Sequence, residues 1–139
     1  MTTSPTSRST SLVRDYYEAL AEGRLVAHRC TDCQAITFPA TTCCESCGSY
    51  AATDVELSGR GSLLFASHNL AACHPRFVPY APYAYAHVVL EEGVTVQGML
   101  QGVDGTPEAI AELYPRLPLP VVAEVLHTDD LPVLTFRLA

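Results

Sequence analysis

The chain has 139 residues, 48% of them hydrophobic, which is enough for one ordinary domain or for two small units. Eight arginines and no lysine stand against fifteen acidic residues, for a formal net charge of −7, and an acidic surface repels the phosphate backbone of nucleic acids. No apolar run approaches the roughly 18–20 residues of a membrane-spanning helix, and the first ten residues do not resemble a secretory signal, so we expect a cytoplasmic protein.

The N-terminal part of the chain predicts a tail followed by a helix. Residues 1–10 are rich in Ser and Thr and are expected to be disordered. In residues 11–23, apolar side chains recur at helical spacing, with Ser11 as the expected N-cap and Gly23 as the residue that ends the helix. The apolar face of this helix carries Tyr16, Tyr17 and Leu20. These side chains either pack on the segment that follows or contact a partner protein, and we take them as candidate interface residues.

Residues 24–50 carry a doubled cysteine motif and are predicted to form a zinc ribbon. Two Cys-x-x-Cys turns, ten residues apart, each direct two sulfurs to one point, and four thiolates in a tetrahedron are a ligand set of structural Zn²⁺. The expected ligands are Cys30, Cys33, Cys44 and Cys47. Gly48 follows the last of them, where such a turn often requires a positive φ. Four protein ligands leave no open coordination position, so the site is expected to hold structure rather than to catalyse a reaction.

Other interpretations of the cysteines stay open at this point. Redox-active Cys-x-x-Cys pairs follow a strand in a βαβ pattern, which is absent here, and a disulfide framework would need an oxidising compartment. Iron fits a tetrahedral thiolate site as zinc does. Cys43 adjoins Cys44 and would be the ligand in a shifted register, but only Cys44 keeps the two-residue spacing to Cys47.

Residues 51–139 predict several short strands and one helix. Strands are expected at 52–57, 62–68, 83–90, 94–100, 121–126 and 133–138, and a helix at 106–113. A glycine turn at 58–61 and a proline-bearing loop at 69–79 separate the first strands. Five or six short strands with one small helix favour a mainly β fold, namely a closed OB-fold β-barrel.

Six short motifs follow one another from the first cysteine turn to the middle of the predicted barrel. They are Arg29-Cys30 with Cys33, Phe38-Pro39, Cys44 with Cys47-Gly48-Ser49, Leu57-Ser58-Gly59-Arg60-Gly61, Pro82-Tyr83, and Glu92-Gly93-Val94. In this order they resemble the zinc-ribbon/OB-fold family of acyl-CoA-associated proteins, long described as a domain of unknown function. The resemblance covers roughly residues 12–138, and the doubled cysteine motif followed by LSGRG is its most specific part.

The resemblance implies an N-terminal helix, a rubredoxin-like zinc ribbon and a C-terminal OB-fold barrel that lack a catalytic constellation of their own. Members of the family assemble with thiolase-fold enzymes (thiolases, ketosynthase-like enzymes and lipid-transfer-protein-type aldolases) or with acyl-CoA hydratase subunits. There they help to bind or channel the CoA thioester. We therefore expect a non-catalytic, zinc-binding accessory subunit of an acyl-CoA-processing complex.

Residues that bind CoA are expected in the barrel part of the chain. Arginine binds phosphate in a bidentate manner and aromatic rings stack on adenine, so the candidates are Arg60, Arg76 and Tyr83. Each also has a structural interpretation, as a solvated turn, a surface loop residue or part of the barrel core. Two other functions remain to be weighed. One is a nucleic-acid-binding ribbon and barrel, which the absence of lysine disfavours, and the other is an enzyme that acts alone through Cys73 or His74.

Overall fold

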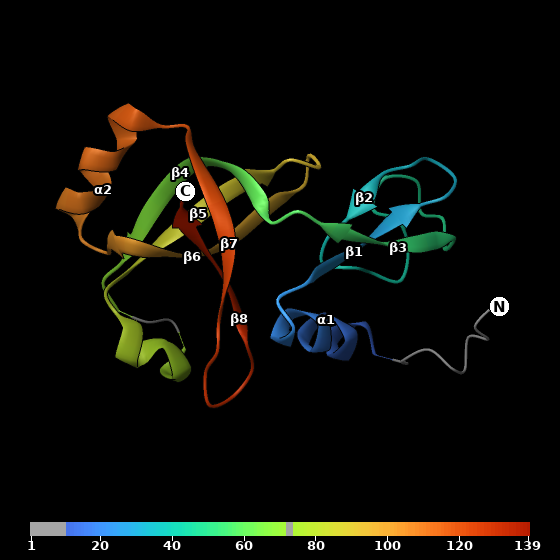
Figure 1. The fold of residues 1–139 in the computed structure, drawn as a ribbon, viewed down its shortest axis with the longest axis horizontal. Helices are drawn as coiled ribbons and strands as arrows, with labels where there is room; N and C mark the ends of the chain where they lie inside the picture. Colours follow the sequence, from blue (N-terminus) through green and yellow to red (C-terminus); the bar gives the residue numbers. More distant parts are fainter. Residues whose placement is uncertain (1–10, 72–73) are drawn as a thin grey trace. The chain divides into compact units, whose positions relative to one another are not determined.

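The computed structural model describes residues 11–71 and 74–139 (Figure 1). Its internal contacts divide the chain into two compact units, which are described here one after the other. The first unit comprises residues 11–57 and His127–Pro132, and the second comprises Ser58–Leu126 and Val133–Ala139. The predicted disordered tail, residues 1–10, lies outside the described residues.

The first unit begins with the helix α1, Leu12–Ala21. Ser11 caps it, because its Oγ accepts a hydrogen bond from the Arg14 backbone N–H at 3.0 Å. Gly23 ends it with a φ of 80°, and its N–H donates to the Leu20 carbonyl at 2.9 Å. The structure thus agrees with both ends predicted for the helix. None of the helices within the described residues is long and apolar enough to cross a membrane.

A small antiparallel sheet with the strand order β2-β1-β3 completes the first unit. Its strands are β1 Leu25–Cys30, β2 Ile36–Thr37 and β3 Ala52–Leu57. β3 pairs along the whole of β1, from Leu25 opposite Leu57 to Cys30 opposite Ala52. The strand at 52–57 therefore lies in the ribbon sheet, although the sequence grouped it with the barrel, because a strand takes its partner from distant parts of the chain.

The second unit is a closed five-stranded barrel with the strand order β4-β5-β6-β8-β7. Its strands are β4 Arg60–Asn69, β5 Tyr83–Leu90, β6 Thr95–Asp104, β7 Leu119–Leu126 and β8 Val133–Leu138. β4 pairs with β7 and closes the ring, while β6 and β8 run parallel and the other neighbours run antiparallel (Figure 1). The connections contain α2 Pro107–Leu113 and the 3₁₀ helices η2 Pro75–Tyr80 and η3 Tyr114–Arg116. This architecture confirms the predicted mainly β fold with an OB-fold barrel.

The interior of the barrel is lined by apolar side chains of different sizes. On β5, Ala84, Ala86 and Val88 are fully buried and share one face of the strand. Gly61 on β4 allows the neighbouring backbone to come close, since a Cβ at this position would lie 2.4 Å from the Val89 carbonyl oxygen. The LSGRG motif therefore ends in a glycine that the packing of two strands requires.

Candidate metal centre

Four cysteine sulfurs converge in the first unit. They belong to Cys30, Cys33, Cys44 and Cys47, and all four Sγ atoms lie within 4.8 Å of one another. The Sγ atoms of Cys30 and Cys47 are 3.6 Å apart, and those of Cys33 and Cys44 are also 3.6 Å apart. The two cysteine turns thus face each other, and each sulfur has a close neighbour from the opposite turn.

These distances fit a tetrahedral metal ion. A Zn–S bond of about 2.3 Å places the sulfurs of a tetrahedron about 3.8 Å apart, close to the two short separations in this cluster. A disulfide would bring two sulfurs to about 2.05 Å, and all four cysteines are free. Within residues 11–71 and 74–139, this is the one group of His, Cys, Asp and Glu side chains arranged to hold a metal ion. The donor set suits Zn²⁺ and tetrahedral iron alike.

The first cysteine turn, residues 30–35, is called here the first knuckle. The Cys30 N–H donates to the Ala35 carbonyl at 2.8 Å, and the Gln34 N–H donates to the Cys30 carbonyl at 2.9 Å. Gln34 has a φ of 68°, a left-handed conformation that glycine adopts more readily. Its side-chain amide donates to the Thr31 carbonyl at 3.2 Å, which helps to hold this conformation.

The second knuckle, residues 44–49, repeats the same backbone pattern. The Cys44 N–H donates to the Ser49 carbonyl at 2.8 Å, and the Gly48 N–H donates to the Cys44 carbonyl at 2.8 Å. Gly48 has a φ of 79°, as the sequence predicted. Gln34 occupies the equivalent position of the first knuckle and was not foreseen, because nothing in its local sequence signals a left-handed residue.

Backbone N–H groups also influence which sulfur loses its proton most readily. The Cys33 N–H, 3.5 Å from the Cys30 sulfur, is the main cause that lowers the pKa of the Cys30 thiol to about 7. The Cys47 N–H is the main cause of a lowered pKa at Cys44. At Cys47 the Ser49 N–H lowers the pKa, but the neighbouring sulfurs, Cys30 first, outweigh it and raise the pKa to about 12. The first cysteine of each knuckle is therefore the readier thiolate, and a metal must displace the proton of the second.

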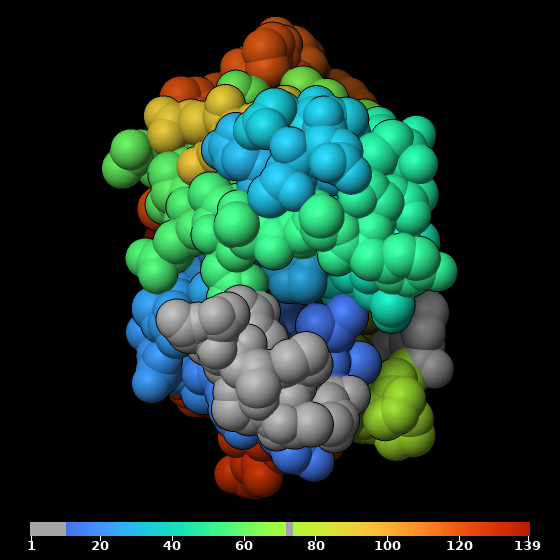
Figure 2. All heavy atoms as spheres, turned by 90° about the vertical axis from the view of Figure 1, so that its right-hand side faces the viewer, coloured from blue at the N-terminus to red at the C-terminus, as the bar shows by residue number. Residues whose placement is uncertain are grey.

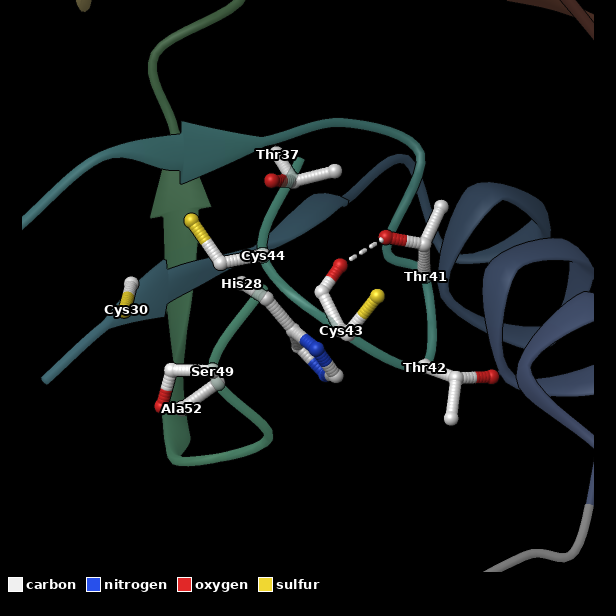
Figure 3. Close-up of a pocket in the computed structure, with 9 residues that line it drawn as sticks. All are labelled: His28, Cys30, Thr37, Thr41, Thr42, Cys43, Cys44, Ser49 and Ala52. Carbon is white, nitrogen blue, oxygen red and sulfur yellow. Dashed lines mark hydrogen bonds between the residues drawn. The ribbon is translucent and has the colours of Figure 1, made fainter. Parts of the chain in front are cut away.

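Cys43 stands apart from this cluster. Figure 3 shows its sulfur on the opposite side of the turn from the Cys44 sulfur, although both residues line the same small cavity of about 10 Å³. The Thr41 hydroxyl donates to the Cys43 carbonyl at 2.7 Å and fixes this part of the turn. The arrangement agrees with the expectation that Cys44, and not Cys43, joins the ligand set.

The metal centre lies close to the surface of the first unit. Cys30 and Cys44 are buried, whereas Cys33 and Cys47 are exposed. Figure 2 turns this unit toward the viewer, and the light-blue to teal atoms of the knuckles and their connection form part of its outer face. A metal held there would have two buried and two exposed cysteine ligands.

The three candidate CoA-binding residues fall in two separate places. Arg60 begins β4, is exposed and forms an ion pair with Glu91 at 3.2 Å. The Arg76 guanidinium lies over the Phe77 ring, 5.0 Å from its centroid, and the Phe77 ring centroid is 6.2 Å from that of the buried Tyr83. The structure therefore gathers Arg76 and Tyr83 around one phenylalanine, and it leaves Arg60 at the opposite end of the β4–β5 ladder.

The three candidate interface residues differ in how deeply they are buried. Tyr16 and Tyr17 are half-buried, with ring centroids 5.0 Å apart, and the Tyr16 ring lies 5.9 Å from that of Phe38 in the connection between the knuckles. Burial, followed by the influence of Tyr17, raises the pKa of Tyr16 to about 12. Leu20 is 1% exposed and belongs to the core of the unit. The two tyrosines thus retain some exposed surface, while Leu20 packs inside.

Two residues of the loop before β5 were considered for a catalytic role. Cys73 lies outside the described residues. His74 caps η2, because its Nδ1 accepts a hydrogen bond from the Arg76 N–H at 3.2 Å. The His74 imidazole therefore has a structural role, because it caps the start of the 3₁₀ helix η2.

Comparison with known proteins finds two matching domain models. The model described as "ChsH2, rubredoxin-like zinc ribbon domain" matches residues 18–50, and "ChsH2, C-terminal OB-fold domain" matches residues 54–112. A chain of the solved structure "Ltp2-ChsH2(DUF35) aldolase" is 32% identical, with a TM-score of 0.71 over 90% of this chain and 92% of that one. A DUF35-family protein of unknown function from Sulfolobus solfataricus, 12% identical with a TM-score of 0.57 over 94% of this chain and 87% of that one, shares the fold.

Two curated proteins are also similar. A probable enoyl-CoA hydratase alpha subunit of Thermomonospora curvata is 34% identical over 126 residues, which are 88% of this chain but only 36% of that protein. A DUF35 domain-containing scaffold protein of Methanocaldococcus jannaschii is 29% identical over 105 residues, 74% of this chain and 72% of that one. The chain thus spans about a third of the hydratase subunit and most of the scaffold protein.

Proposed function

The chain belongs to the ChsH2 (DUF35) family of zinc-ribbon and OB-fold proteins, and from this membership we propose that it is a zinc-binding accessory subunit of an acyl-CoA-processing enzyme. The observation that carries the proposal is its similarity, over nearly the whole length, to a chain of an Ltp2-ChsH2(DUF35) aldolase. The proposed partner is a cytoplasmic thiolase-fold enzyme of the thiolase, ketosynthase-like or aldolase type, or an acyl-CoA hydratase subunit. The names of the two curated relatives, a hydratase subunit and a scaffold, support the same role.

In this proposal the cysteine cluster holds a structural Zn²⁺ ion. Cys30, Cys33, Cys44 and Cys47 would be its ligands, and a closed set of four thiolates supplies folding free energy rather than a reactive position. The metal would lock the two knuckles together and so hold the ribbon sheet in the form that the partner recognises.

The barrel is proposed to contribute to binding of the CoA thioester. Arg76 is one candidate, since its guanidinium lies over the Phe77 ring, which is close to the ring of Tyr83. Arg60 is the second candidate, and it forms an ion pair with Glu91. An Arg76→Ala exchange is expected to raise the KM of the complex for acyl-CoA several-fold while the complex remains assembled, and an unchanged KM would remove the residue from the proposed site.

The test of the proposal is affinity co-purification of the tagged chain from its native host, with the metal quantified in the same sample. A stoichiometric acyl-CoA enzyme and about one zinc ion per chain are expected. A single, zinc-bearing chain with no partner, or iron at the same stoichiometry, would contradict the corresponding part of the proposal.

Nucleic-acid binding is the alternative function, because OB-fold barrels also bind oligonucleotides. The barrel, however, carries few cations, and two of its exposed arginines, Arg60 and Arg137, form ion pairs with Glu91 and Glu124. Binding to nucleic acids requires cations that are free to replace counterions on phosphates. Nucleic acid that stays with the purified chain through a high-salt wash would favour this alternative.

A further inference from the structure

The first unit contains a groove between α1 and the ribbon sheet, distinct in position from the cysteine cluster. Its volume is about 490 Å³, within the range of sites that enclose small ligands or several side chains. The helix and the strands that form it lie next to each other in one unit (Figure 1). The groove is thus a property of the ribbon unit alone.

The floor of the groove is apolar. Leu12, Tyr16 and Ala19 contribute from α1, and Val26 contributes from β1. The Tyr16 ring is half-buried, and burial raises the pKa of its hydroxyl to about 12. Aliphatic side chains would therefore be accommodated at the bottom of the groove.

The rim of the groove is acidic. It carries the four carboxylates of Asp15, Glu18, Glu22 and Asp54. The one arginine in the lining, Arg24, is already engaged, since its guanidinium lies 2.8 Å from Glu22 and 3.5 Å from Glu56. The rim therefore presents negative charge to anything that approaches.

Two of these carboxylates are outside the ion pairs of the described residues. Asp15 and Glu18 form no side-chain ion pair within residues 11–71 and 74–139, and both are exposed. Asp54 faces only the His28 imidazole, at 3.4 Å. The surrounding residues 11–57 hold seven acidic residues and three arginines, so the groove lies in a region of like charge. A cationic occupant would relieve this repulsion, whereas a phosphate or an acidic peptide would add to it.

We propose that this groove binds a segment of the partner subunit in which arginine or lysine side chains alternate with aliphatic ones. The aliphatic side chains would cover the apolar floor, and the cations would meet Asp15 and Glu18 at the rim. The inference rests on the proposed function for the existence of a partner subunit. It adds the site on this chain and the chemistry of the segment that occupies it.

The test uses the full chain and a fluorescein-labelled twelve-residue peptide of alternating leucine and arginine, followed by fluorescence anisotropy. We expect binding that weakens with salt and that falls about tenfold in the double variant Asp15→Asn/Glu18→Gln. The matched control is Glu108→Gln/Glu112→Gln, which removes two exposed carboxylates from α2 and should leave the affinity unchanged. Equal binding of a leucine–glutamate peptide, or equal affinity of both double variants, would overturn the inference.

A parallel measurement separates this inference from the proposed function. Both double variants are used as bait in the co-purification, and the yield of the acyl-CoA enzyme is compared with that of the wild-type chain. Loss of the enzyme only with Asp15→Asn/Glu18→Gln is expected. If this variant captures the enzyme as fully as the wild-type chain does, the groove is rejected as the binding site and the proposed function stands. If the wild-type chain binds the peptide but captures no acyl-CoA enzyme, the proposed function is rejected.

Discussion

The two cysteine knuckles have the same hydrogen bonds and the same left-handed fifth residue, but they reach this geometry by different means. The second knuckle has Gly48 at that position, where a side chain is absent and positive φ costs little. The first knuckle has Gln34, which must be held in place by its surroundings. Cys30 is the last residue of β1 and pairs with Ala52, so the first knuckle is anchored to the sheet. Local freedom in one turn and tertiary support in the other thus produce the same arrangement of sulfurs.

The largest effect is expected from loss of a metal ligand, and it should be the same in both knuckles. Cys30→Ser and Cys44→Ser should each abolish stoichiometric zinc binding and unfold the ribbon, because a structural zinc site contributes about 10–16 kcal/mol of apparent binding free energy. Metal analysis and near-UV circular dichroism would report both losses. Cys43→Ser is the matched control and should keep one metal per chain. Retention of a full zinc equivalent by either ligand variant would contradict the assignment.

The next effect concerns the glycine of the second knuckle. Gly48→Ala should lower the free energy of unfolding by about 1–2 kcal/mol, because alanine is strained at a φ of 79°. The strain is the only expected cost, since a Cβ at this position meets no atom within 4 Å. Urea unfolding, followed by the reactivity of the released thiols, measures the change. A variant as stable as the wild type would show that the second knuckle is also held by its surroundings.

The reciprocal exchange in the first knuckle should act in the opposite direction. Gln34→Gly removes left-handed strain but also removes the side-chain hydrogen bond to Thr31, so a small net gain of about 0.5 kcal/mol is expected. The same urea experiment compares it with Gln34→Asn, another residue that tolerates positive φ. A clear loss of stability in Gln34→Gly would mean that the glutamine side chain matters more than its backbone conformation.

The smallest effect is spectroscopic and tests whether the metal also orders the connection between the knuckles. Tyr16 packs against Phe38 in that connection, and burial holds the pKa of its hydroxyl at about 12. Because the buried hydroxyl resists ionisation, the packing of Tyr16 contributes to stability below the ordinary tyrosine pKa of about 10. This contribution is lost as the pH rises through about 12. An absorbance titration at 295 nm should show a late-titrating tyrosine that disappears in Tyr16→Phe. After removal of the metal, this tyrosine should titrate near 10, and no change would show that α1 packs independently of the metal.

Much of the site could be predicted from the sequence because its signals are local. The cysteine spacing identified the ligand set, Ser11 and Gly23 marked the ends of α1, and the alternation of residues 83–90 identified the strand β5. Features that depend on distant partners could not be predicted. The conformation of Gln34 follows from the ligand geometry, and the pairing of 52–57 with β1 depends on a strand more than twenty residues earlier.

The order of the strands along the chain also has a consequence for how the protein is made. The four cysteines and the three strands of the ribbon sheet have all been synthesised once the ribosome has added Leu57. The barrel closes only later, because β4 pairs with β7 and β6 pairs with β8, and β7 and β8 are the last two strands of the chain. At about 5–20 residues per second, the ribosome needs roughly 4–16 s to add the residues between these points. All four candidate metal ligands are thus synthesised seconds before the last strand of the barrel, so the order of the chain allows a metal ion to bind before the barrel closes.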